Sequence, residues 1–502
     1  MCGFLGIIDF NQQINLPAFK KSLEKIKHRG PDSSCIWSES RHIALGHNRL
    51  SIIDTSTNGN QPMESSNKEA IIVFNGEIYN YEELKNNLSF SNFKSTSDTE
   101  TILEGYVEQG TSFFKKLRGI YSFAIIDRRN GVKIILVRDP SGVKPLYYHL
   151  TKTRIVFGSE IKSLKPLMKN NLEINQTAIK QYLNLGFVPE PNTAFQQISA
   201  LNPGNYLSWS SKSNLIQKQF FKFKYDDLNS NSYSENIEKT FSLLEIAVKR
   251  NLVSDVNINL SLSGGIDSSL IYYLANKQNK DIFSQTISFS KDQDFDESEI
   301  SKIYANHING KHKIYNLKSD IDLDLIDKIF LHFDQPYADT SAIPTYFINK
   351  HASKSTKVML GGDGGDELFN GYPSQTILSL LLPLRKIRFL WSMLNSTKAI
   401  FSNNMYRKVN RVINLMGKNK SVFDILYNSN SWFPMLSSIN GEAAFKNRKD
   451  QKHIKDYESL FSDEIPRKLN NKIIFDYYRK TLLSDYLRKT DMMSMMNGVE
   501  WR

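Results

Sequence analysis

The sequence contains only two cysteines in 502 residues, Cys2 and Cys35. So few cysteines exclude a disulfide framework and favour a reducing compartment. No apolar run is long enough to span a membrane, since the nearest one, 376–384, is interrupted by Pro383. The amino terminus has no basic segment before its short apolar run, which argues against a secretory signal. We therefore expect a cytoplasmic protein without a membrane span.

Acidic residues are missing from one long stretch, although the chain as a whole carries a net charge of +12. Between Glu367 and Asp424 there is none, whereas nine lysines and arginines lie between Arg385 and Lys420. Such a stretch can bind nucleic acid or a membrane surface. No nucleic-acid-binding motif accompanies it, so we interpret 373–423 as an insertion with a solvated helical face and expect no nucleic-acid partner.

The length of the chain exceeds what one ordinary hydrophobic core can organise. Its 40% apolar and 23% charged residues are typical of a soluble globular protein. The polar run 226–232 indicates a linker, and we expect two domains, 2–220 and 221–502. Short strands separated by turns fill the first domain, whereas strands and helices alternate in the second. Alternation of that kind predicts a doubly wound parallel sheet with its ligand at the carboxyl ends of the strands.

A glycine-rich loop, 261–269, is the clearest candidate for an anion site. The residues before it, 256–260, alternate as in a strand, and those after it, 270–275, predict the start of a helix. Gly264 and Gly265 allow backbone N–H groups to converge on an anion beside the positive end of a helix dipole. The lysine of the Walker motif is absent. The plain alternative is a glycine-rich turn that caps a buried helix.

This loop resembles the pyrophosphate loop of the ATP pyrophosphatase superfamily, whose members adenylate a substrate and release pyrophosphate. The resemblance implies that Asp267 binds Mg²⁺, consistent with the preference of this ion for carboxylates. For Leu262 and Ile287, which the resemblance places beside adenine, strand core is the alternative interpretation. The ATP-binding residues that it implies in and near the loop are Leu262, Ser263, Gly264, Gly265, Asp267, Ser268 and Ile287.

A second glycine-rich loop, 361–372, follows the predicted strand 358–360 and carries three carboxylates, Asp363, Asp366 and Glu367, interleaved with glycines. In isolation it could be a metal loop. Together with the first loop it resembles the signature of the asparagine synthetase family. The resemblance implies a general base at Asp363, where many family members have glutamate. It further implies Asp366 beside Asp267 on Mg²⁺, and Gly361 and Gly362 close to the nucleotide.

The chain begins Met1-Cys2-Gly3, and removal of Met1 would leave a free α-amino group on a cysteine. An α-amine titrates near ~7.7–8 and can act as a general base toward its own thiol. Taken alone, a buried structural cysteine explains the segment as well. Together with four later segments it resembles the glutaminase domain of class II glutamine amidotransferases, which are N-terminal nucleophile (Ntn) hydrolases with an αββα sandwich. The segments are 28–32, 46–54, 74–80 and 96–100.

That resemblance implies a glutamine site around the Cys2 nucleophile. Arg49 would pair with the α-carboxylate of glutamine as a bidentate fork, and Glu77 and Asp98 would hold its α-ammonium. The Asn75 side chain and the Gly76 N–H would form the oxyanion hole. The alternatives are an Asn-Gly hairpin turn at 75–76 and solvated surface charges at Arg49 and Asp98.

Two later segments resemble parts of the asparagine synthetase family that face the acceptor. These are the loop 333–342 and the helical segment 486–500, where Lys489 and Asp491 could equally be salt-bridged residues of a helix surface. We interpret the methionines at 492–496 as core residues. The sequence ends within what resembles a family motif, and the lysine that the family uses during adenylation lies further on. We therefore expect either a chain that continues beyond Arg502 or an impaired synthetase half.

The combined resemblance implies a glutamine-hydrolysing asparagine synthetase that uses ATP and Mg²⁺. Glutamine would release ammonia at Cys2, and ammonia would cross to an adenylated aspartate. An alternative acceptor is another carboxylate, such as a sugar uronate of a surface polysaccharide. A third hypothesis is a non-catalytic binding or regulatory protein. The expected partners are small molecules (glutamine, aspartate and ATP), and a homodimer is left open.

Overall fold

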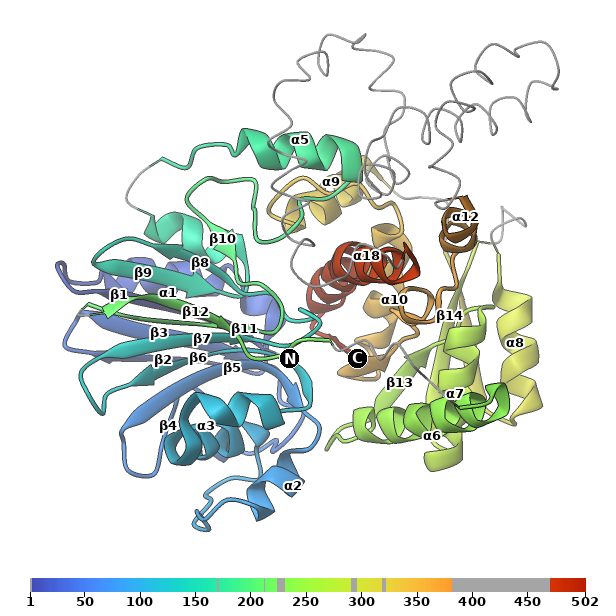
Figure 1. Cartoon of the computed structure of the whole chain (residues 1–502), viewed down its shortest axis with the longest axis horizontal. Helices are drawn as coiled ribbons and strands as arrows, with labels where there is room; N and C mark the ends of the chain where they lie inside the picture. Colours follow the sequence, from blue (N-terminus) through green and yellow to red (C-terminus); the bar gives the residue numbers. More distant parts are fainter. Residues whose placement is uncertain are drawn as a thin grey trace, which may run out of the picture.

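The computed structural model describes residues 2–168, 171–211, 213–223, 231–289, 296–317, 322–381 and 470–502. The basic stretch from Arg385 to Lys420 and most of the predicted linker 226–232 lie outside these residues. Figure 1 shows two bodies side by side, a layered body from the first half of the chain and a sheet with helices from the second. No helix among the described residues is both long and apolar enough to cross a membrane.

The first half contains two antiparallel sheets of six strands each. In the first sheet the order is β10-β8-β9-β1-β3-β2, and in the second it is β12-β11-β7-β6-β5-β4. The strands of the first sheet are β1 (Gly3–Asp9), β2 (Ser33–Glu39), β3 (Ile43–Arg49), β8 (Tyr147–Leu150), β9 (Arg154–Gly158) and β10 (Ser199–Ala200). Those of the second are β4 (Met63–Glu64), β5 (Ala70–Ile78), β6 (Gly119–Asp127), β7 (Lys133–Arg138), β11 (Asn205–Ser210) and β12 (Ser213–Gln219).

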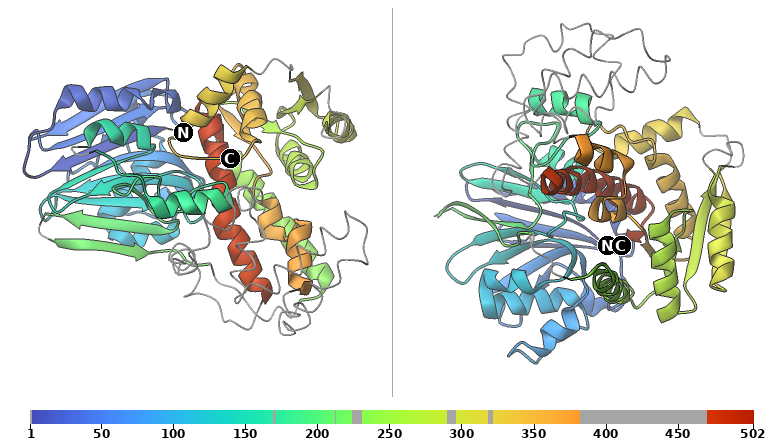
Figure 2. Two further views of the ribbon diagram at one scale, coloured as in Figure 1. Left: turned by 90° about the horizontal axis from the view of Figure 1, so that it is seen from above. Right: turned by 45° about the vertical axis from the view of Figure 1, so that its right-hand side comes forward.

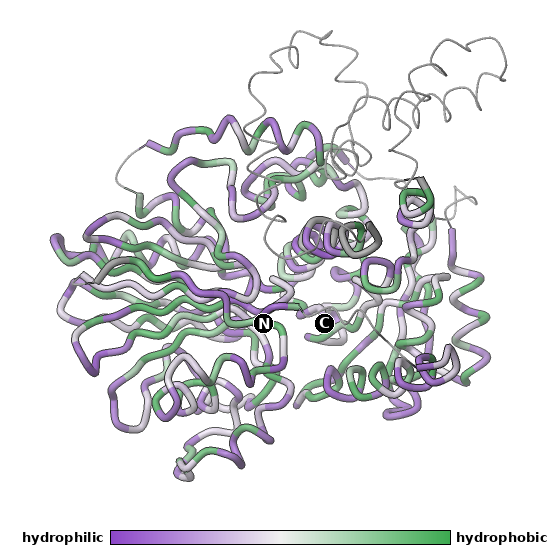
Figure 3. Tube along the Cα trace, in the orientation of Figure 1, coloured by the Kyte–Doolittle hydropathy of each residue, from purple (hydrophilic) through white to green (hydrophobic). Residues whose placement is uncertain are grey.

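In the central strands of both sheets, successive residues are apolar and buried (Figure 3). These strands are therefore covered on both faces. Successive side chains of a strand point to opposite faces. Phe4 accordingly lies in the core between the sheets, and Leu5 packs against α1 (Leu16–Glu24) and α4 (Ile161–Leu164). In the second sheet Ile71 faces the first sheet, and Ile72 packs with α2 (Tyr81–Asn86) and α3 (Asp98–Gln109). The predicted αββα sandwich is therefore confirmed.

The second half is built on a five-stranded parallel sheet with the order β15-β14-β13-β16-β17. One face packs on α6, α7 and α8, and the other on α10, so the predicted doubly wound sheet is also confirmed. Its strands are β13 (Ile258–Ser261), β14 (Phe283–Ser288), β15 (Lys311–Asn316), β16 (Val358–Leu360) and β17 (Glu500–Trp501). The helices are α6 (Tyr233–Asn251), α7 (Ile266–Gln278), α8 (Ser298–His307), α9 (Leu323–His332), α10 (Ala342–Ala352), α11 (Gly365–Phe369) and α12 (Pro373–Leu381).

The strand order places β13 and β16 next to each other, with Leu260 paired to Leu360. The chain winds outward from this pair in opposite directions, which makes it the topological switch point of the sheet. Both glycine-rich loops leave the carboxyl ends of these two strands. The sheet therefore brings the two loops together, although about 90 residues separate them in the sequence.

A long helix, α18 (Asn470–Met495), lies between the two bodies and leads into β17 (Figures 1 and 2). It contacts α10, α11 and α12, so it also closes the apolar core that these helices share. Met492 and Met493 are buried in this core, and Met495 is buried in the core around α2 and α3, as predicted. The strand β17 was not expected from the sequence, because two residues are too few to show an alternating pattern.

Candidate active sites

The candidate nucleophile Cys2 lies directly before β1 and is 8% exposed. Its backbone N donates a hydrogen bond to Asn75 Oδ1 at 3.0 Å, and its carbonyl accepts one from Arg29 Nε at 3.1 Å. The sulfur lies 4.0 Å from the carbonyl oxygen of Leu50. Burial raises the pKa of the Cys2 thiol, so a nearby base is needed to form the thiolate at neutral pH.

Asn75 and Gly76 lie within β5, so the hairpin-turn alternative for this pair is wrong. Asn75 Nδ2 is buried and has no hydrogen-bond partner among the described residues. A buried donor without a partner costs free energy unless a ligand uses it. Gly76 has a φ of 145°, and a Cβ at this position would lie 2.1 Å from the carbonyl oxygen of Ile120. Only glycine fits there, which leaves its N–H unobstructed by a side chain.

One pocket is lined by all the residues that the glutaminase resemblance implied except Asn75, which accepts a hydrogen bond from the Cys2 backbone N. Asp98 and Arg49 are both buried, so the surface-charge alternative is wrong for them. Asp98 accepts a hydrogen bond from the Ile78 N–H at 2.9 Å, and burial raises its pKa to about 6. The Arg49 guanidinium donates hydrogen bonds to Asn60 Oδ1 at 3.0 Å and to the backbone carbonyl of Asp54. The lining includes Cys2, Arg49, Gly76, Glu77 and Asp98.

The nucleotide loop begins at the end of β13 and continues into α7, whose N-cap is Gly265. The Ser263 and Ser268 hydroxyls lie 2.8 Å apart, and Ser263 Oγ accepts a hydrogen bond from the Gly265 N–H at 3.1 Å. The Gly264 N–H donates to Glu297 Oε2 at 2.9 Å. The carboxylate of Glu297 therefore occupies one backbone donor of the predicted anion site.

A second pocket opens above the carboxyl end of the parallel sheet. It brings Leu262, Ser263 and Ile287 of the predicted nucleotide site to one place together with Asp363. Gly361 and Gly362 serve close packing instead of lining this pocket: a Cβ on Gly361 would lie 2.3 Å from Trp501 Nε1, and one on Gly362 would lie 3.0 Å from the Ser268 N. The lining also includes Thr286, Glu297, Thr490 and Trp501.

Asp267 and Asp366 approach each other where the two glycine-rich loops meet. A Cβ on Gly365 would lie 2.2 Å from Asp267 Oδ2, and one on Gly371 would lie 2.0 Å from Asp366 Oδ1. Burial raises the pKa of Asp267, and the charge of Asp366 raises it further. Two neighbouring carboxylates are suited to a divalent cation that neutralises both charges, so these residues fit Mg²⁺.

The candidate general base Asp363 is exposed and is held by the helix α18, where Thr490 Oγ1 donates to Asp363 Oδ2 at 3.1 Å. Lys489 and Asp491 form the salt bridges that the alternative interpretation expected, but both are buried, so they do not lie on a helix surface. Lys489 Nζ lies 3.3 Å from Asp339 Oδ2 in the loop 333–342. Asp491 Oδ2 lies 2.9 Å from Arg29 Nη2 in the sandwich.

A cavity of about 190 Å³ lies between the two bodies. Ile120, Val143 and Lys144 contribute to it from the sandwich, and Leu487 contributes from α18. Three further residues, Asp363, Thr490 and Trp501, line both this cavity and the nucleotide pocket. The nucleotide pocket therefore continues toward the sandwich through a partly apolar space.

Comparison with known protein families supports both halves of this description. A family model described as a glutamine amidotransferase domain matches residues 1–221, and one described as asparagine synthase matches residues 239–502, more than half of the chain. The chain belongs to the asparagine synthase family.

The chain spans only part of the length of the individual relatives that it matches. The chain is 34% identical over 378 residues to glutamine-hydrolyzing asparagine synthetase 1 of Bacillus subtilis, which covers 74% of this chain and 59% of that protein. It is also 34% identical over 391 residues to a relative from Methanocaldococcus jannaschii, 74% of this chain and 76% of that protein. The amidase chry2 of Gibberella zeae is 29% identical over 383 residues, 72% of this chain and 56% of that protein.

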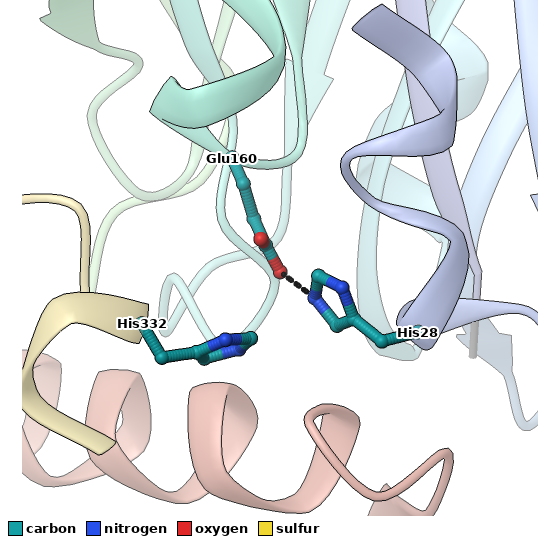
Figure 4. Close-up of side chains that lie close together, drawn as sticks. All are labelled: His28, Glu160 and His332. Carbon is teal, nitrogen blue, oxygen red and sulfur yellow. Dashed lines mark hydrogen bonds and ion pairs between the residues drawn. The ribbon is translucent and has the colours of Figure 1, made fainter. Parts of the chain in front are cut away.

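One further cluster of side chains has the residue types of a metal site. Ligand atoms of His28, Glu160 and His332 lie within 4.8 Å of one another, and Figure 4 shows the three side chains facing a common point. However, Glu160 is already paired with Arg29 and with Lys162, each at 2.9 Å. Two fixed cations on the same carboxylate oppose the binding of a metal cation. We interpret the cluster as a contact between the bodies, because His28 and Glu160 belong to the sandwich, whereas His332 is the last residue of α9 in the second half.

Three residues of these sites did not stand out in the sequence. Glu297 follows a loop and shows no motif of its own, so its contact with Gly264 required the fold. Thr490 is one of many threonines, and only its contact with Asp363 sets it apart. Arg502 reaches Glu77 Oε2 at 2.7 Å across 425 positions of sequence. No local pattern announces a contact over such a separation.

Proposed function

We propose that this chain is a glutamine-dependent ligase that transfers ammonia from glutamine to an adenylated carboxylate, with aspartate as the acceptor and asparagine as the product. One observation carries the proposal. The pocket around Cys2 and the pocket of the two glycine-rich loops are separate, and the cavity between the bodies adjoins the second pocket at Asp363. Two chemically different sites in one chain are what a two-step amide transfer requires.

In the first half, Cys2 would attack the side-chain amide of glutamine once Met1 is removed. The freed α-amine would lie at the position of the present backbone N, 3.0 Å from Asn75 Oδ1, and would act as the base for the thiol. The free Asn75 Nδ2 and the Gly76 N–H would stabilise the developing oxyanion. Arg49 would bind the α-carboxylate, and Glu77 and Asp98 the α-ammonium. Collapse of the intermediate gives a thioester and ammonia.

In the second half, ATP would bind with its phosphates at the loop 261–269. The backbone donor at Gly264, which now binds Glu297, would bind phosphate oxygen instead. Asp267 and Asp366 would hold Mg²⁺, which supplies neutralising charge to the phosphates of the leaving pyrophosphate. Leu262 and Ile287 would contact the base, with Ser263 and Ser268 beside the phosphates. Asp363 would accept a proton from ammonia as it attacks the adenylate.

Ammonia would cross along the apolar part of the cavity, which Ile120, Val143 and Leu487 line beside Lys144 and Asp491. Apolar side chains do not offer a proton, so they favour passage of neutral ammonia over ammonium. The acyl-adenylate is needed because a carboxylate oxygen is itself a poor leaving group. Ammonia then displaces AMP, and the products are the amide, AMP and pyrophosphate.

Residues beside the nucleotide pocket bear on the identity of the acceptor. The buried Lys489 with Asp339 and Ser341 next to the nucleotide pocket suits a small, charged acceptor such as aspartate. A second candidate is another carboxylate, such as a sugar uronate. It is favoured by the aspartate at position 363, where the family resemblance leads us to expect glutamate in many members, and by a relative that carries the name amidase.

ATP–pyrophosphate exchange tests the function and separates the two acceptors. We expect Mg²⁺-dependent exchange of labelled pyrophosphate into ATP when aspartate is present, and none without an acceptor. Exchange with a uronic acid but none with aspartate would favour the second candidate. Absence of exchange with every carboxylate tried, in a chain that still hydrolyses glutamine, would contradict the proposed ligase.

The same proposal assigns residues 2–220 to the glutaminase and 221–502 to the ATP-dependent half. β12 ends at Gln219 and α6 begins at Tyr233, which supports a boundary in this interval. Both cysteines are free thiols. A thiol nucleophile and substrates of intermediary metabolism suit the cytoplasm, where thiols stay reduced.

A further inference from the structure

A cavity of about 610 Å³ lies between the sandwich and the helix α6 of the second half. The sandwich contributes residues of α2, the last residue of α3 and part of the 3₁₀ helix η3 (Gly110–Lys116), and α6 contributes Arg250. The cavity shares no lining residue with the three pockets described above. Its volume falls within the range of about 300–1,000 Å³ that is typical of small-molecule sites.

One wall of the cavity is apolar and rigid. It is formed by Leu84, Leu88 and Phe113. Leu84 and Phe113 belong to the buried core of the sandwich, and Leu88 packs against the same core. Because close packing fixes this wall, it offers a preformed surface to the apolar part of a ligand.

The charged side chains of the cavity are mostly positive. Lys116, Arg118 and Arg250 line it together with a single acid, Glu83. In the part of the chain that the structure describes, neither Arg118 nor Arg250 forms an ion pair with a carboxylate. Three positive charges against one negative charge attract an anion into the cavity.

The cations at the end of η3 are held in place by Asn80. Its Nδ2 donates to the Lys116 carbonyl at 3.1 Å, and its Oδ1 accepts from the Arg118 N–H at 2.9 Å. Arg118 Nη1 donates to the carbonyls of Lys115 at 2.9 Å and Leu117 at 3.0 Å. Within the described residues, Nε and Nη2 of Arg118 have no acceptor, so this edge of the guanidinium is available for a bidentate contact with an anion.

We propose that this cavity binds a small organic phosphate. The phosphate lies between Arg118 of the sandwich and Arg250 of α6, and the remainder of the molecule packs on the apolar wall. A phosphate group carries a charge of about −1.5 to −2 near neutral pH, which suits the excess of positive charge better than one carboxylate does. This site is independent of the proposed function, because no residue of the glutamine or nucleotide pocket lines it.

Calorimetry on the full chain in a buffer containing EDTA tests the ligand class, with phenyl phosphate as the probe. Phenyl phosphate combines a dianion with an apolar ring. We expect it to bind about tenfold more tightly than inorganic phosphate, which cannot bury a ring on the apolar wall. It should also bind about tenfold more tightly than benzoate, which has a single charge. Equal affinity for either comparison compound would overturn the proposed ligand class.

Substitution of the two arginines tests the position of the phosphate. Arg118→Gln and Arg250→Gln should each weaken the binding of phenyl phosphate about tenfold, since hydrogen bonds to charged groups contribute on that scale. Lys115→Gln and Lys249→Gln are the matched controls, because each removes a positive charge next to an arginine or lysine of the cavity without lining it. Unchanged affinity in the arginine variants, as expected for binding at the loop 261–269, or an equal loss in the controls would overturn the proposal.

A variant with the opposite expected effect excludes a loss of binding through misfolding. Glu83→Gln removes the one negative charge that lines the cavity. The affinity for phenyl phosphate should rise by up to about fivefold, the size of an exposed pairwise charge interaction. An unchanged or lower affinity in Glu83→Gln would overturn the placement of the anion in this cavity.

Discussion

The two candidate sites of this chain are built by opposite means. Around Cys2, Arg49 and Asn75 come from buried strands and Asp98 from the first turn of α3, and Asn75 and Asp98 are 0% and 4% exposed. At the nucleotide site the polar groups are mostly backbone N–H groups of glycine-rich loops, and Ile266 in the first of them is 79% exposed. The first site is preorganised by its core, whereas the second is open to a larger ligand.

This difference predicts how strongly single side-chain substitutions should affect each site. In the glutamine pocket the chemistry depends on individual side chains, so deleting one side chain should remove a step. At the nucleotide site the backbone has to come close to the ligand, and the binding free energy is distributed over contacts with many atoms. Single side-chain deletions there should have smaller effects on rate.

The largest expected effect is that of Cys2→Ala, which separates the two sites. We expect glutamine-dependent amide formation to fall by at least about 10³-fold, because no other nucleophile lines the pocket in the position of the thiol. Synthesis from added ammonium salt should continue. The assay is product formation with each nitrogen donor. The matched control is Cys35→Ala, which removes the other free cysteine and should retain both activities.

Asn75→Ala tests the buried donor of the glutamine pocket. Loss of one oxyanion-hole donor lowers kcat by about 10²–10³-fold in other enzymes, and we expect a similar loss of glutaminase kcat. The KM for glutamine should change much less, because the contact forms chiefly in the transition state. Steady-state glutaminase kinetics measure both. A rise of KM with unchanged kcat would show that Asn75 binds the ground state instead.

Asp366→Asn tests the carboxylate pair of the open site. Removing one charge should raise the Mg²⁺ concentration for half-maximal pyrophosphate exchange by about tenfold or more, since even outer partners of metal ligands have effects of that size. The raised pKa of Asp267 should fall back toward its ordinary range once the neighbouring charge is gone. Titration of exchange with Mg²⁺ at several pH values measures both effects. An unchanged Mg²⁺ requirement would contradict the assignment.

The glutamine site should weaken in acid because of Asp98. Its pKa is raised to about 6 by burial, and only the ionised carboxylate attracts an ammonium group. As the pH falls below about 6, the fraction ionised falls by about tenfold per pH unit, so the KM for glutamine should rise. The measurement is the glutaminase KM between pH 5 and 8, a range that extends about one to two units on either side of this pKa. A flat KM across this range would exclude Asp98 as the ligand.

Thr490→Val should have the smallest effect. It removes the hydroxyl that bonds Asp363, and a single such bond contributes about 0.5–1.5 kcal/mol, or up to about tenfold in rate. We expect a reduced rate of amide formation from ammonia with unchanged pyrophosphate exchange, because Asp363 acts after adenylation. Thr490→Ser keeps the hydroxyl and should restore the rate. Equal loss in both variants would show that only packing is involved.

The sequence was sufficient for the fold class and for most of the glutamine pocket. Apolar runs and glycine-rich loops report local structure, so the sandwich strands and the two loops could be predicted from residues close together in the chain. Arg49, Glu77 and Asp98 were found through a resemblance and not through periodicity, because a buried charge looks like a surface charge in sequence.

The contacts that α18 and β17 make with distant segments could not be predicted. Thr490 with Asp363, Arg29 with Asp491 and Arg502 with Glu77 each join segments more than 100 residues apart. Such pairs depend on how α18 and β17 dock, which is a property of the assembled core. Lys489 was also ambiguous for this reason, since its burial follows from the docking of α18.

Transfer of nitrogen between the two sites is the central claim, and an isotope competition tests it most directly. The full chain is supplied with ATP, Mg²⁺, aspartate and glutamine labelled with ¹⁵N in the side-chain amide, in a buffer containing unlabelled ammonium. If ammonia passes inside the protein, the amide product carries more ¹⁵N than the ammonium in solution does. Product with the same ¹⁵N content as the dissolved ammonium would contradict this account.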